Sequence, residues 1–245
     1  MKFIGVIPAR FASTRFPGKP LALLHDKPMI QWVIEGARKS KLLSELIVAT
    51  DHPGIRKAAE AVGARVAMTA SELPSGTDRI FAATKDLEFD VVVNIQGDEP
   101  LVTGALIDSL AGVFQAAVNV DMATLAHPIS LAELESVNAV KVVLNQKDEA
   151  LYFSRYAIPY SRVAGAKAGA LSGCLKHIGM YAYTKDFLKK FCEARPAEIE
   201  VAESLEQLRA LYLGARIKVL RVQEASLGVD TPEDLAQLEK IMRGK

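Results

Sequence analysis

The sequence predicts an α/β protein built around a parallel sheet that helices cover on both faces. Short apolar runs such as "FIGVI" and "DVVVNI" alternate with amphipathic segments such as "PGIRKAAEAVG". The apolar runs are continuous rather than alternating, which is typical of strands buried on both faces. Repeated strand–helix–strand units favour parallel strands joined by right-handed crossovers.

The first half of the chain contains most of this regular pattern. Strands are expected at residues 3–7, 46–50, 65–69 and 90–95, with helices at 28–40, 53–63 and 78–87. A further helix is expected after residue 100, because apolar side chains recur there on one helical face: Leu106, Leu110, Val113, Phe114 and Ala117.

The second half is less regular, beginning near residue 121. Its expected elements are strands at 140–144, 177–183 and 216–222, and the last two helices at 202–214 and 231–243. Residues 161–173 are rich in small side chains and are expected to form a mobile loop. Because no repeat or linker is visible, we expect a single domain over 1–245, with halves 1–120 and 121–245.

Composition excludes several classes of function. A net charge of +1 over 245 residues gives no general field for nucleic acid or an anionic membrane. No apolar run approaches the roughly 20 residues of a membrane span, and the N-terminal run is short for a secretory signal. Cys174 and Cys192 are the only cysteines, which favours a reducing, cytoplasmic setting without disulfides. We expect neither nucleic acid binding nor membrane insertion.

Polar loops follow all four strands of the first half, at the sheet edge where open α/β sheets bind ligands. They are "IPARFASTRFPGKPL", "TDHPG", "ASELPSGTDR" and "QGDEP". The first loop carries Arg10, Arg15 and Lys19 without an acid, and it matches neither a Walker A nor a dinucleotide motif. Forked guanidinium donors and a compact ammonium suit a triphosphate. A solvated surface loop is the alternative interpretation.

Two aspartates are candidate ligands for the Mg²⁺ that accompanies a triphosphate. Asp98 follows an expected buried strand, and Mg²⁺ binds one or two carboxylates together with phosphate oxygens and water. In "GVDTPEDL", Thr231, Pro232 and Asp234 already account for a helix start, which leaves Asp230 without a capping role. A simple turn at Asp98 and a helix-dipole role for Asp230 remain as alternatives.

Six motifs, in order, resemble those of the 3-deoxy-manno-octulosonate (Kdo) cytidylyltransferases, which activate Kdo for lipopolysaccharide biosynthesis. They are "VIPARFASTRFPGKPL", "NIQGDEP", "YFSR", "HIGMYAY", "LEQLR" and "GVDTPEDL". The resemblance implies a three-layer α/β/α sandwich with a mixed, mostly parallel central sheet, of the nucleotide-diphospho-sugar transferase type. It implies transfer from CTP to Kdo with Mg²⁺, giving CMP-Kdo and pyrophosphate, and a homodimer. Residues 1–120 would bind the nucleotide, and 121–245 would bind sugar and form the dimer.

The same resemblance implies the site residues. Catalysis would involve Arg10, Lys19, Asp98 and Asp230, with metal held by the two aspartates. The nucleotide would be bound by Ala9, Arg10, Ser13, Arg15, Lys19, Ser75, Gly76, Arg79 and Asp98. The sugar pocket would contain Gln96, Arg155, His177, Tyr183, Glu206 and Gln207. The sugar's anomeric hydroxyl would attack the α-phosphorus, with Lys19 and Arg10 stabilising charge on the phosphates.

The chemistry of an acidic polyol suits this second set. Arg155 or His177 could supply the cation for the sugar's carboxylate. We expect Glu203, Glu206 and Gln207 on one helix face, and the rings of Tyr181 and Tyr183 on opposite sides of their strand. The alternatives are a surface pair between Glu206 and Arg209, and a structural strand histidine at 177.

The sequence leaves three alternative functions to consider: transfer to a different acidic sugar, glycosyl transfer, and nucleotide binding without catalysis. The family commonly has Pro-Gly-Thr-Gly before "VDTPEDL" where this chain has "EASLG", and often an Asp after "IPY" where Ser161 and Arg162 stand. Both differences lie near the expected sugar side, so 8-amino-Kdo or a sialic acid is an alternative substrate. A metal-dependent glycosyltransferase would show an Asp-x-Asp-like motif. A silent nucleotide-binding protein would have lost Lys19 or an aspartate, and all three are present.

Overall fold

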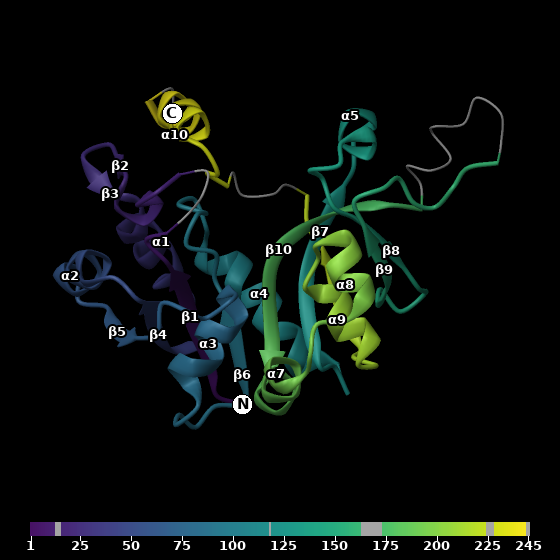
Figure 1. Cartoon of the computed structure of the whole chain (residues 1–245), viewed down its shortest axis with the longest axis horizontal. Coiled ribbons are helices and arrows are strands. Elements are labelled where there is room, and N and C mark those ends of the chain that lie inside the picture. Colours follow the sequence, from purple (N-terminus) through teal and green to yellow (C-terminus); the bar gives the residue numbers. More distant parts are fainter. Residues whose placement is uncertain (13–15, 118, 163–172, 224–227, 244–245) are drawn as a thin grey trace. The chain divides into compact units, whose positions relative to one another are not determined.

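A computed structural model of the chain describes residues 1–12, 16–117, 119–162, 173–223 and 228–243. The chain divides into two compact units. Figure 1 labels their helices and strands and colours them by position in the sequence. The first unit comprises Met1–Ala111 and Ser226–Lys245, and the second comprises Gly112–Ala225. No helix among the described residues is long and apolar enough to cross a bilayer.

The first unit contains a four-stranded parallel sheet in the order β6-β1-β4-β5. The strands are β1 (Phe3–Ala9), β4 (Leu43–Thr50), β5 (Arg65–Met68) and β6 (Val91–Asn94). In register, Val6 of β1 lies between Ile47 of β4 and Asn94 of β6. Strands β1 and β6 are buried almost throughout, which confirms the prediction from their continuous apolar runs.

Helices cover both faces of this sheet. They are α1 (Met29–Ala37), α2 (Pro53–Ala61), α3 (Gly76–Thr84) and α4 (Gly104–Ala116), the last running on into the second unit. The chain moves outward from β1 to β4 to β5 and then returns to β6. Right-handed crossovers therefore place α1 and α2 on one face and α3 on the other.

The C-terminal helix belongs to the first unit, whereas the sequence pattern grouped it with residues 121–245. Helix α10 (Pro232–Arg243) places Leu238 in a buried cluster with Val229, Leu24 and Met29. The small hairpin of β2 (Leu23–Leu24) and β3 (Lys27–Pro28) and the short helix η1 (Lys19–Leu21) lie in the same unit. The apolar side of α10 is thereby covered, and residues 228–231 are held beside the first-unit loops.

The second unit has a mixed sheet in the order β11-β7-β10-β8-β9. Strands β11 and β7 are parallel and the other pairs are antiparallel. The strands are β7 (Met122–Pro128), β8 (Lys141–Leu144), β9 (Ala150–Ser154), β10 (Leu175–Thr184) and β11 (Ile217–Arg221). With the parallel strands of the first unit, they confirm the predicted α/β class and the mixed, mostly parallel sheet.

The helices of the second unit correct one expectation. They are α5 (Leu131–Glu135), α7 (Lys185–Glu193), α8 (Glu198–Glu203) and α9 (Gln207–Tyr212). The expected single helix at 202–214 is interrupted, because Ser204 adopts a left-handed conformation with φ of 52°. Glu203 therefore lies on a different helix from Gln207, and the three polar residues do not share one helix face.

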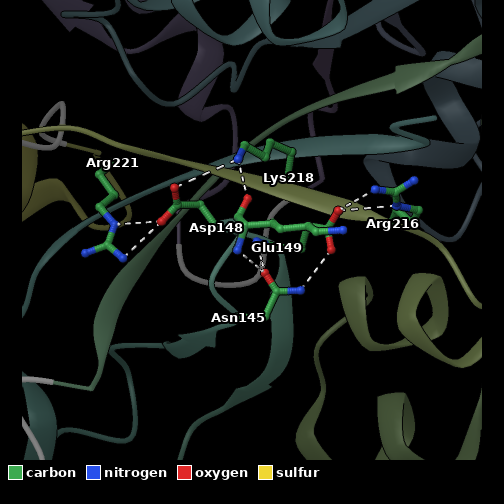
Figure 2. Close-up of polar contacts among 7 residues, drawn as sticks. Asn145, Asp148, Glu149, Arg216, Lys218 and Arg221 are labelled. Atoms are coloured by element: carbon green, nitrogen blue, oxygen red, sulfur yellow. Dashed lines mark hydrogen bonds and ion pairs between the residues drawn. The ribbon is translucent and has the colours of Figure 1, made fainter. Parts of the chain in front are cut away.

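An ion-pair network, which we call the hairpin network, attaches the β8–β9 hairpin to β11. Arg221 donates to Asp148 Oδ1 at 3.0 Å and Arg216 to Glu149 Oε1 at 2.8 Å, while Asn145 donates to Glu149 Oε2 (Figure 2). Lys218 donates to the carbonyl of Lys147. The backbone amide of Val219 also bonds to the Asp148 carbonyl at 2.8 Å. The network thus joins the β8–β9 hairpin to β11 through side-chain and backbone contacts.

Candidate functional site

The polar loops of the first unit are fastened to one another by a buried arginine. Arg79, on α3, is 2% exposed and donates to Asp51 Oδ2 at 3.0 Å and to Thr69 Oγ1 at 2.5 Å. A third bond reaches the carbonyl of Ala70 at 3.3 Å. The loops after β4 and β5 are joined in this way. Arg79 was expected to contact nucleotide, but in this structure its guanidinium supports the loops from inside.

An aromatic stack positions the first loop. The rings of Phe11 and His52 are 4.0 Å apart and nearly parallel, at 14°. His52 Nδ1 also accepts a bond from the Gly54 amide at the start of α2, and the amide of Gly18 bonds to the Phe11 carbonyl. Gly18 has φ of 71°, a left-handed conformation that suits glycine and turns the chain into η1. Sequence reasoning missed this contact, although the histidine before the proline in "TDHP" signalled a helix cap.

Three residues distant in sequence meet at the centre of these loops, in a group that we call the central cluster. Lys19 Nζ lies 2.7 Å from Asp98 Oδ2 and 3.4 Å from Asp230 Oδ1. The same ammonium donates to the carbonyl of Val229 at 2.9 Å. The Lys19 side chain is only 13% exposed. The structure therefore brings together the lysine and the two aspartates that the sequence singled out.

The position of Asp230 is fixed by its own helix start. Asp234 Oδ2 accepts from the amides of Asp230 and Thr231 at 3.0 and 2.9 Å, and Thr231 Oγ1 accepts from the Asp234 amide. The Val229 amide bonds to the Asp98 carbonyl at 2.9 Å. Since Asp234 and Thr231 cap α10 as predicted, the carboxylate of Asp230 is directed to the cluster without serving as the cap.

The donor set of the central cluster fits a hard divalent cation that binds together with phosphate. Two carboxylates lie within 3.4 Å of one ammonium nitrogen, so the cluster carries an excess negative charge. Mg²⁺ commonly takes one or two carboxylates and completes its octahedron with phosphate oxygens and water. Among the described residues, no group of three or more His, Cys, Asp or Glu forms a self-sufficient metal cage. The position of the Lys19 ammonium marks the point at which the two carboxylates stabilise a positive charge.

The remaining nucleotide candidates lie around this cluster or outside the described residues. Ala9 ends β1 and is buried, and Arg10 follows it with an exposed side chain. Ser75 caps α3 by accepting from the Asp78 amide at 3.2 Å. A Cβ built on Gly76 would lie 3.5 Å from the Pro8 side chain, so the start of α3 lies beside the end of β1. Ser13 and Arg15 lie outside the described residues.

The sugar candidates belong mainly to the second unit, whereas Gln96 follows β6 in the first. Arg155, after β9, donates from Nε to the Glu203 carbonyl at 2.8 Å and from its two terminal nitrogens to the carbonyls of Val137 and Ser204. Glu203 in turn accepts from Ser154 Oγ at 2.7 Å and from the Arg155 amide at 2.9 Å. Backbone carbonyls hold the guanidinium without neutralising its charge.

Of the two cations that the sequence left open for the sugar carboxylate, Arg155 and His177, the structure disfavours His177. Its ring is 8% exposed, lies edge-on to Phe153 at 5.0 Å and bonds through Nε2 to Thr124 Oγ1 at 2.9 Å. Burial away from water disfavours the charged ring and lowers the pKa of His177 to about 3. At neutral pH His177 is therefore an uncharged hydrogen-bonding group, which leaves Arg155 as the cation of this set.

The two tyrosines of β10 correct another expectation. The ring centroids of Tyr181 and Tyr183 are 6.0 Å apart, and Tyr181 lies 5.4 Å from His177. Side chains two residues apart in a strand point to the same face, so the prediction of opposite faces was wrong. Burial raises the pKa of Tyr181, and the nearby carboxylate of Glu206 raises it further. Gln207, at the start of α9, is 4% exposed.

A buried lysine near Arg155 was not predicted. Lys141 has no exposed surface, and its ammonium donates to the carbonyls of Ser136, Ala139 and Arg155 at 2.6, 2.8 and 2.6 Å. Burial lowers its pKa. The only signal in the sequence was a lysine inside the apolar run "VKVVL". Arg209 is likewise buried, in a pair with Glu200, whose Oε2 lies 2.7 Å from its Nε.

Comparisons with known proteins give one consistent result. A family model described as cytidylyltransferase matches residues 4–217. The chain is 72% identical over 242 residues to the 3-deoxy-manno-octulosonate cytidylyltransferase of Bdellovibrio bacteriovorus, covering 99% of this chain and 98% of the relative. It is 43% identical over 251 residues to the protein of that name from Serratia proteamaculans, covering both chains completely.

Solved structures agree with the sequence relatives. The structure of a CMP:2-keto-3-deoxy-manno-octonic acid synthetase complexed with CTP matches with a TM-score of 0.94 at 40% identity, covering 100% of this chain and 99% of that one. A 4-diphosphocytidyl-2C-methyl-D-erythritol synthase from Anaerococcus prevotii matches with a TM-score of 0.65 at 12% identity, covering 99% of both chains. The second likeness is one of fold alone.

Proposed function

Because the chain belongs to the 3-deoxy-manno-octulosonate cytidylyltransferase family, we propose that it transfers a cytidylyl group from CTP to Kdo. The products are CMP-Kdo, the activated sugar of lipopolysaccharide biosynthesis, and pyrophosphate. One observation carries the proposal: Lys19, Asp98 and Asp230 converge at the carboxyl ends of the first-unit strands. Such convergence is what a metal–triphosphate complex requires.

The nucleotide occupies the loops of the first unit. Arg10 and Lys19 lie at the two ends of the loop after β1 and neutralise the triphosphate, together with Ser13 and Arg15 from the middle of that loop. Ser75 and Gly76 contact the cytosine and ribose, because the start of α3 lies beside the end of β1. Arg79 acts indirectly, by holding the loops after β4 and β5.

Asp98 and Asp230 hold the Mg²⁺ that accompanies CTP. Their carboxylates stabilise a positive charge at one point, the ammonium of Lys19, so the same two residues would hold Mg²⁺ together with phosphate oxygens. Bound there, Mg²⁺ supplies positive charge for the phosphates and for an oxygen that is losing its proton. The residues fit the ion without any further protein ligand.

The reaction is an in-line displacement at the α-phosphorus. The anomeric hydroxyl oxygen of Kdo forms the new bond to this phosphorus, and the bond from phosphorus to the bridging oxygen of the β-phosphate breaks. The electron pair of that bond leaves with pyrophosphate, and the hydroxyl proton passes to solvent. Lys19 and Arg10 stabilise the charge that develops on the phosphates, which is the main contribution a protein makes to phosphoryl transfer.

The second unit recognises the acidic sugar. Arg155 binds the carboxylate, because its charge is held by neutral carbonyls and its fork has donors in addition to those already bonded. In this unit His177, Tyr183, Glu206 and Gln207 contact hydroxyl groups. These assignments place mixed donors and acceptors around a polyol.

A homodimer formed through the second unit is part of the proposal. Large apolar side chains are exposed on this unit, among them Val137, Leu151, Tyr156 and Tyr160 at 59%, 59%, 78% and 86%. A second copy would cover such a surface. The reaction belongs in the cytoplasm, where CTP is available.

A pyrophosphate-release assay tests the function. The purified protein is mixed with Mg²⁺, one nucleoside triphosphate and one sugar from a panel of Kdo, 8-amino-Kdo and a sialic acid. We expect release with CTP and Kdo, and much less when UTP replaces CTP. Faster release with 8-amino-Kdo than with Kdo would assign the amino sugar as the substrate instead. If none of the sugars supports pyrophosphate release, the protein binds nucleotide without catalysing transfer.

A further inference from the structure

A buried threonine of the second unit lies at an irregularity of β10, directly beside His177. Thr124, on β7, has no exposed surface. Its hydroxyl oxygen lies 3.1 Å from the Ile178 carbonyl oxygen, 2.9 Å from that of Met180 and 2.9 Å from His177 Nε2. The register between β10 and β7 shifts between Ile178 and Tyr181, so residues 179 and 180 have no partner on β7 and the hydroxyl lies directly beside this irregularity.

The proton count at this hydroxyl decides which ring nitrogen carries hydrogen. A threonine hydroxyl has one proton to donate and lone pairs that accept. The carbonyl oxygens of Ile178 and Met180 can only accept, so the proton of Thr124 is directed to them. His177 Nε2 must then donate to the threonine oxygen. The reverse arrangement would leave two buried carbonyl oxygens facing Oγ1 with no proton between them, at a substantial cost.

The second ring nitrogen is consequently an acceptor. His177 is neutral because burial lowers its pKa to about 3, so the ring has a single proton. Its packing partners, Phe153 at 5.0 Å and Tyr181 at 5.4 Å, are aromatic rings. Within the described part of the chain, Nδ1 makes no hydrogen bond. A lone pair at this position can receive a hydrogen bond from a ligand.

We propose that Thr124 is a positioning residue for sugar recognition. It holds His177 in the Nε2–H tautomer, so that Nδ1 accepts a hydrogen bond from a sugar hydroxyl. The inference rests on the proposed function, in which His177 contacts the sugar. It adds that His177 Nδ1 accepts the hydrogen bond and that the sugar hydroxyl donates it. The site therefore selects a sugar that donates at this point, and a deoxy or O-methyl substituent there is disfavoured.

The tautomer is tested directly by NMR on the full-length protein with ¹⁵N-labelled histidine, without substrates. We expect the ¹⁵N shifts of His177 to show a protonated Nε2 and an unprotonated Nδ1. In Thr124→Val this preference should weaken, because the acceptor of the Nε2 proton is gone. A protonated Nδ1 in the wild-type protein would overturn the proposal and leave cytidylyl transfer untouched.

Kinetics test the sugar contact. Thr124→Val should raise KM for Kdo about five- to tenfold, the effect of misdirecting one neutral hydrogen bond, with KM for CTP unchanged. Thr124→Ser should restore the wild-type value. Thr84→Val is the matched control, because Thr84 is 1% exposed and donates to the Ile80 carbonyl at 2.8 Å. An unchanged KM for Kdo in a folded Thr124→Val protein would overturn the proposal.

Two substitutions of His177 give a second test that does not depend on Thr124. An asparagine can place its carbonyl oxygen near the position of Nδ1, and a glutamine can place its amide near Nε2. We expect His177→Asn to keep more affinity for Kdo than His177→Gln, and the opposite order would contradict the proposal. Absence of pyrophosphate release by the wild-type protein would overturn the sugar contact together with the proposed function, while the nitrogen shifts would still decide the tautomer.

Discussion

The central cluster and the hairpin network are built from the same types of side chain, one in each unit, but their charges are arranged differently. In the central cluster, one ammonium that is 13% exposed lies between two carboxylates. In the hairpin network, Asp148 and Glu149 face Arg216, Lys218 and Arg221 (Figure 2), and Arg221 is 61% exposed. The first has excess negative charge and the second has excess positive charge on a solvated surface.

The two groups also differ in what their local structure needs from them. The hairpin network joins a hairpin to a neighbouring strand. In the central cluster, the backbone bond from Val229 to Asp98 and the cap formed by Thr231 and Asp234 already hold the segments. The ion pairs of the cluster are therefore additional to these backbone and capping contacts. The two clusters thus differ in burial, in charge balance and in how far backbone bonds already hold their segments, and these differences support the proposed binding role of the central cluster.

The largest expected effect comes from Asp98→Asn. The substitution keeps the shape of the turn and removes one of two proposed metal ligands, so turnover should fall about 10³-fold. The free energy of unfolding should change by less than about 1 kcal/mol, because the segments are held by backbone bonds. Pyrophosphate release measures the first quantity and urea denaturation the second.

The matched control for that experiment is Asp148→Asn in the hairpin network. It removes a carboxylate that accepts two bonds from Arg221. We expect turnover within about twofold of the wild-type value, since the proposed chemistry does not involve this group. Near-normal turnover in Asp98→Asn, or a large loss in Asp148→Asn, would remove the distinction between the two clusters.

Replacing a buried and an exposed lysine compares how much each contributes to the free energy of unfolding. Lys141→Met should lower the free energy of unfolding by about 3 kcal/mol, because three buried carbonyls lose the ammonium that bonds them. Lys218→Met, in the exposed hairpin network, should cost less than about 1 kcal/mol. Urea denaturation of both variants checks the difference. Equal decreases in the free energy of unfolding would show that the three buried hydrogen bonds of Lys141 stabilise the fold no more than the exposed contacts of Lys218.

A smaller effect is expected for metal binding without nucleotide. In Lys19→Met the ammonium that lies 2.7 Å from Asp98 and 3.4 Å from Asp230 is gone, so less positive charge offsets the two carboxylates. We expect this variant to bind Mn²⁺ about tenfold more tightly than the wild-type protein, measured by electron paramagnetic resonance. Lys218→Met is the control and should leave the affinity unchanged. Weaker Mn²⁺ binding in Lys19→Met would contradict the metal assignment.

Most of the fold of the first unit could be predicted because its signals are local. Continuous apolar runs identified the strands, and the order of strand and helix fixed the edge at which loops such as that of Asp98 gather. The capping pattern at Thr231 and Asp234 singled out Asp230. Its proximity to Asp98, however, accompanies the packing of α10 and Val229 against Leu24 and Met29, which no local pattern predicts.

The second unit was predicted less completely because its polar residues depend on distant partners. Lys141 and Thr124 are polar residues in apolar strands, and their contacts with the Arg155 and Met180 carbonyls, and of Thr124 with His177, become visible only in the folded chain. The break at Ser204 follows a left-handed backbone that periodicity does not reveal. The sequence left open whether Arg155 or His177 supplies a cation, and burial, which lowers the pKa of His177 to about 3, makes that ring neutral. In each case tertiary contacts override a local preference.

The smallest expected effect is the change in stability on replacing Glu149, which tests whether the hairpin network contributes only the weak, pH- and salt-dependent stabilisation of a surface ion pair. The Asn145 side chain and then Arg216 lower the pKa of Glu149, because both donate to its carboxylate. A carboxyl with a lowered folded-state pKa stabilises the protein above its unfolded pKa, near 4.3, and loses that effect as pH falls through the folded value. The urea midpoint of Glu149→Gln should therefore lie slightly below that of the wild-type protein at pH 7, and this difference in midpoint should disappear below about pH 4.

High salt should also reduce the difference in urea midpoint, because exposed ion pairs are screened. A gap that persists unchanged at pH 3 and in 1 M salt would show that Glu149 acts through packing rather than charge, and the network would then resemble the central cluster more closely than its exposure suggests.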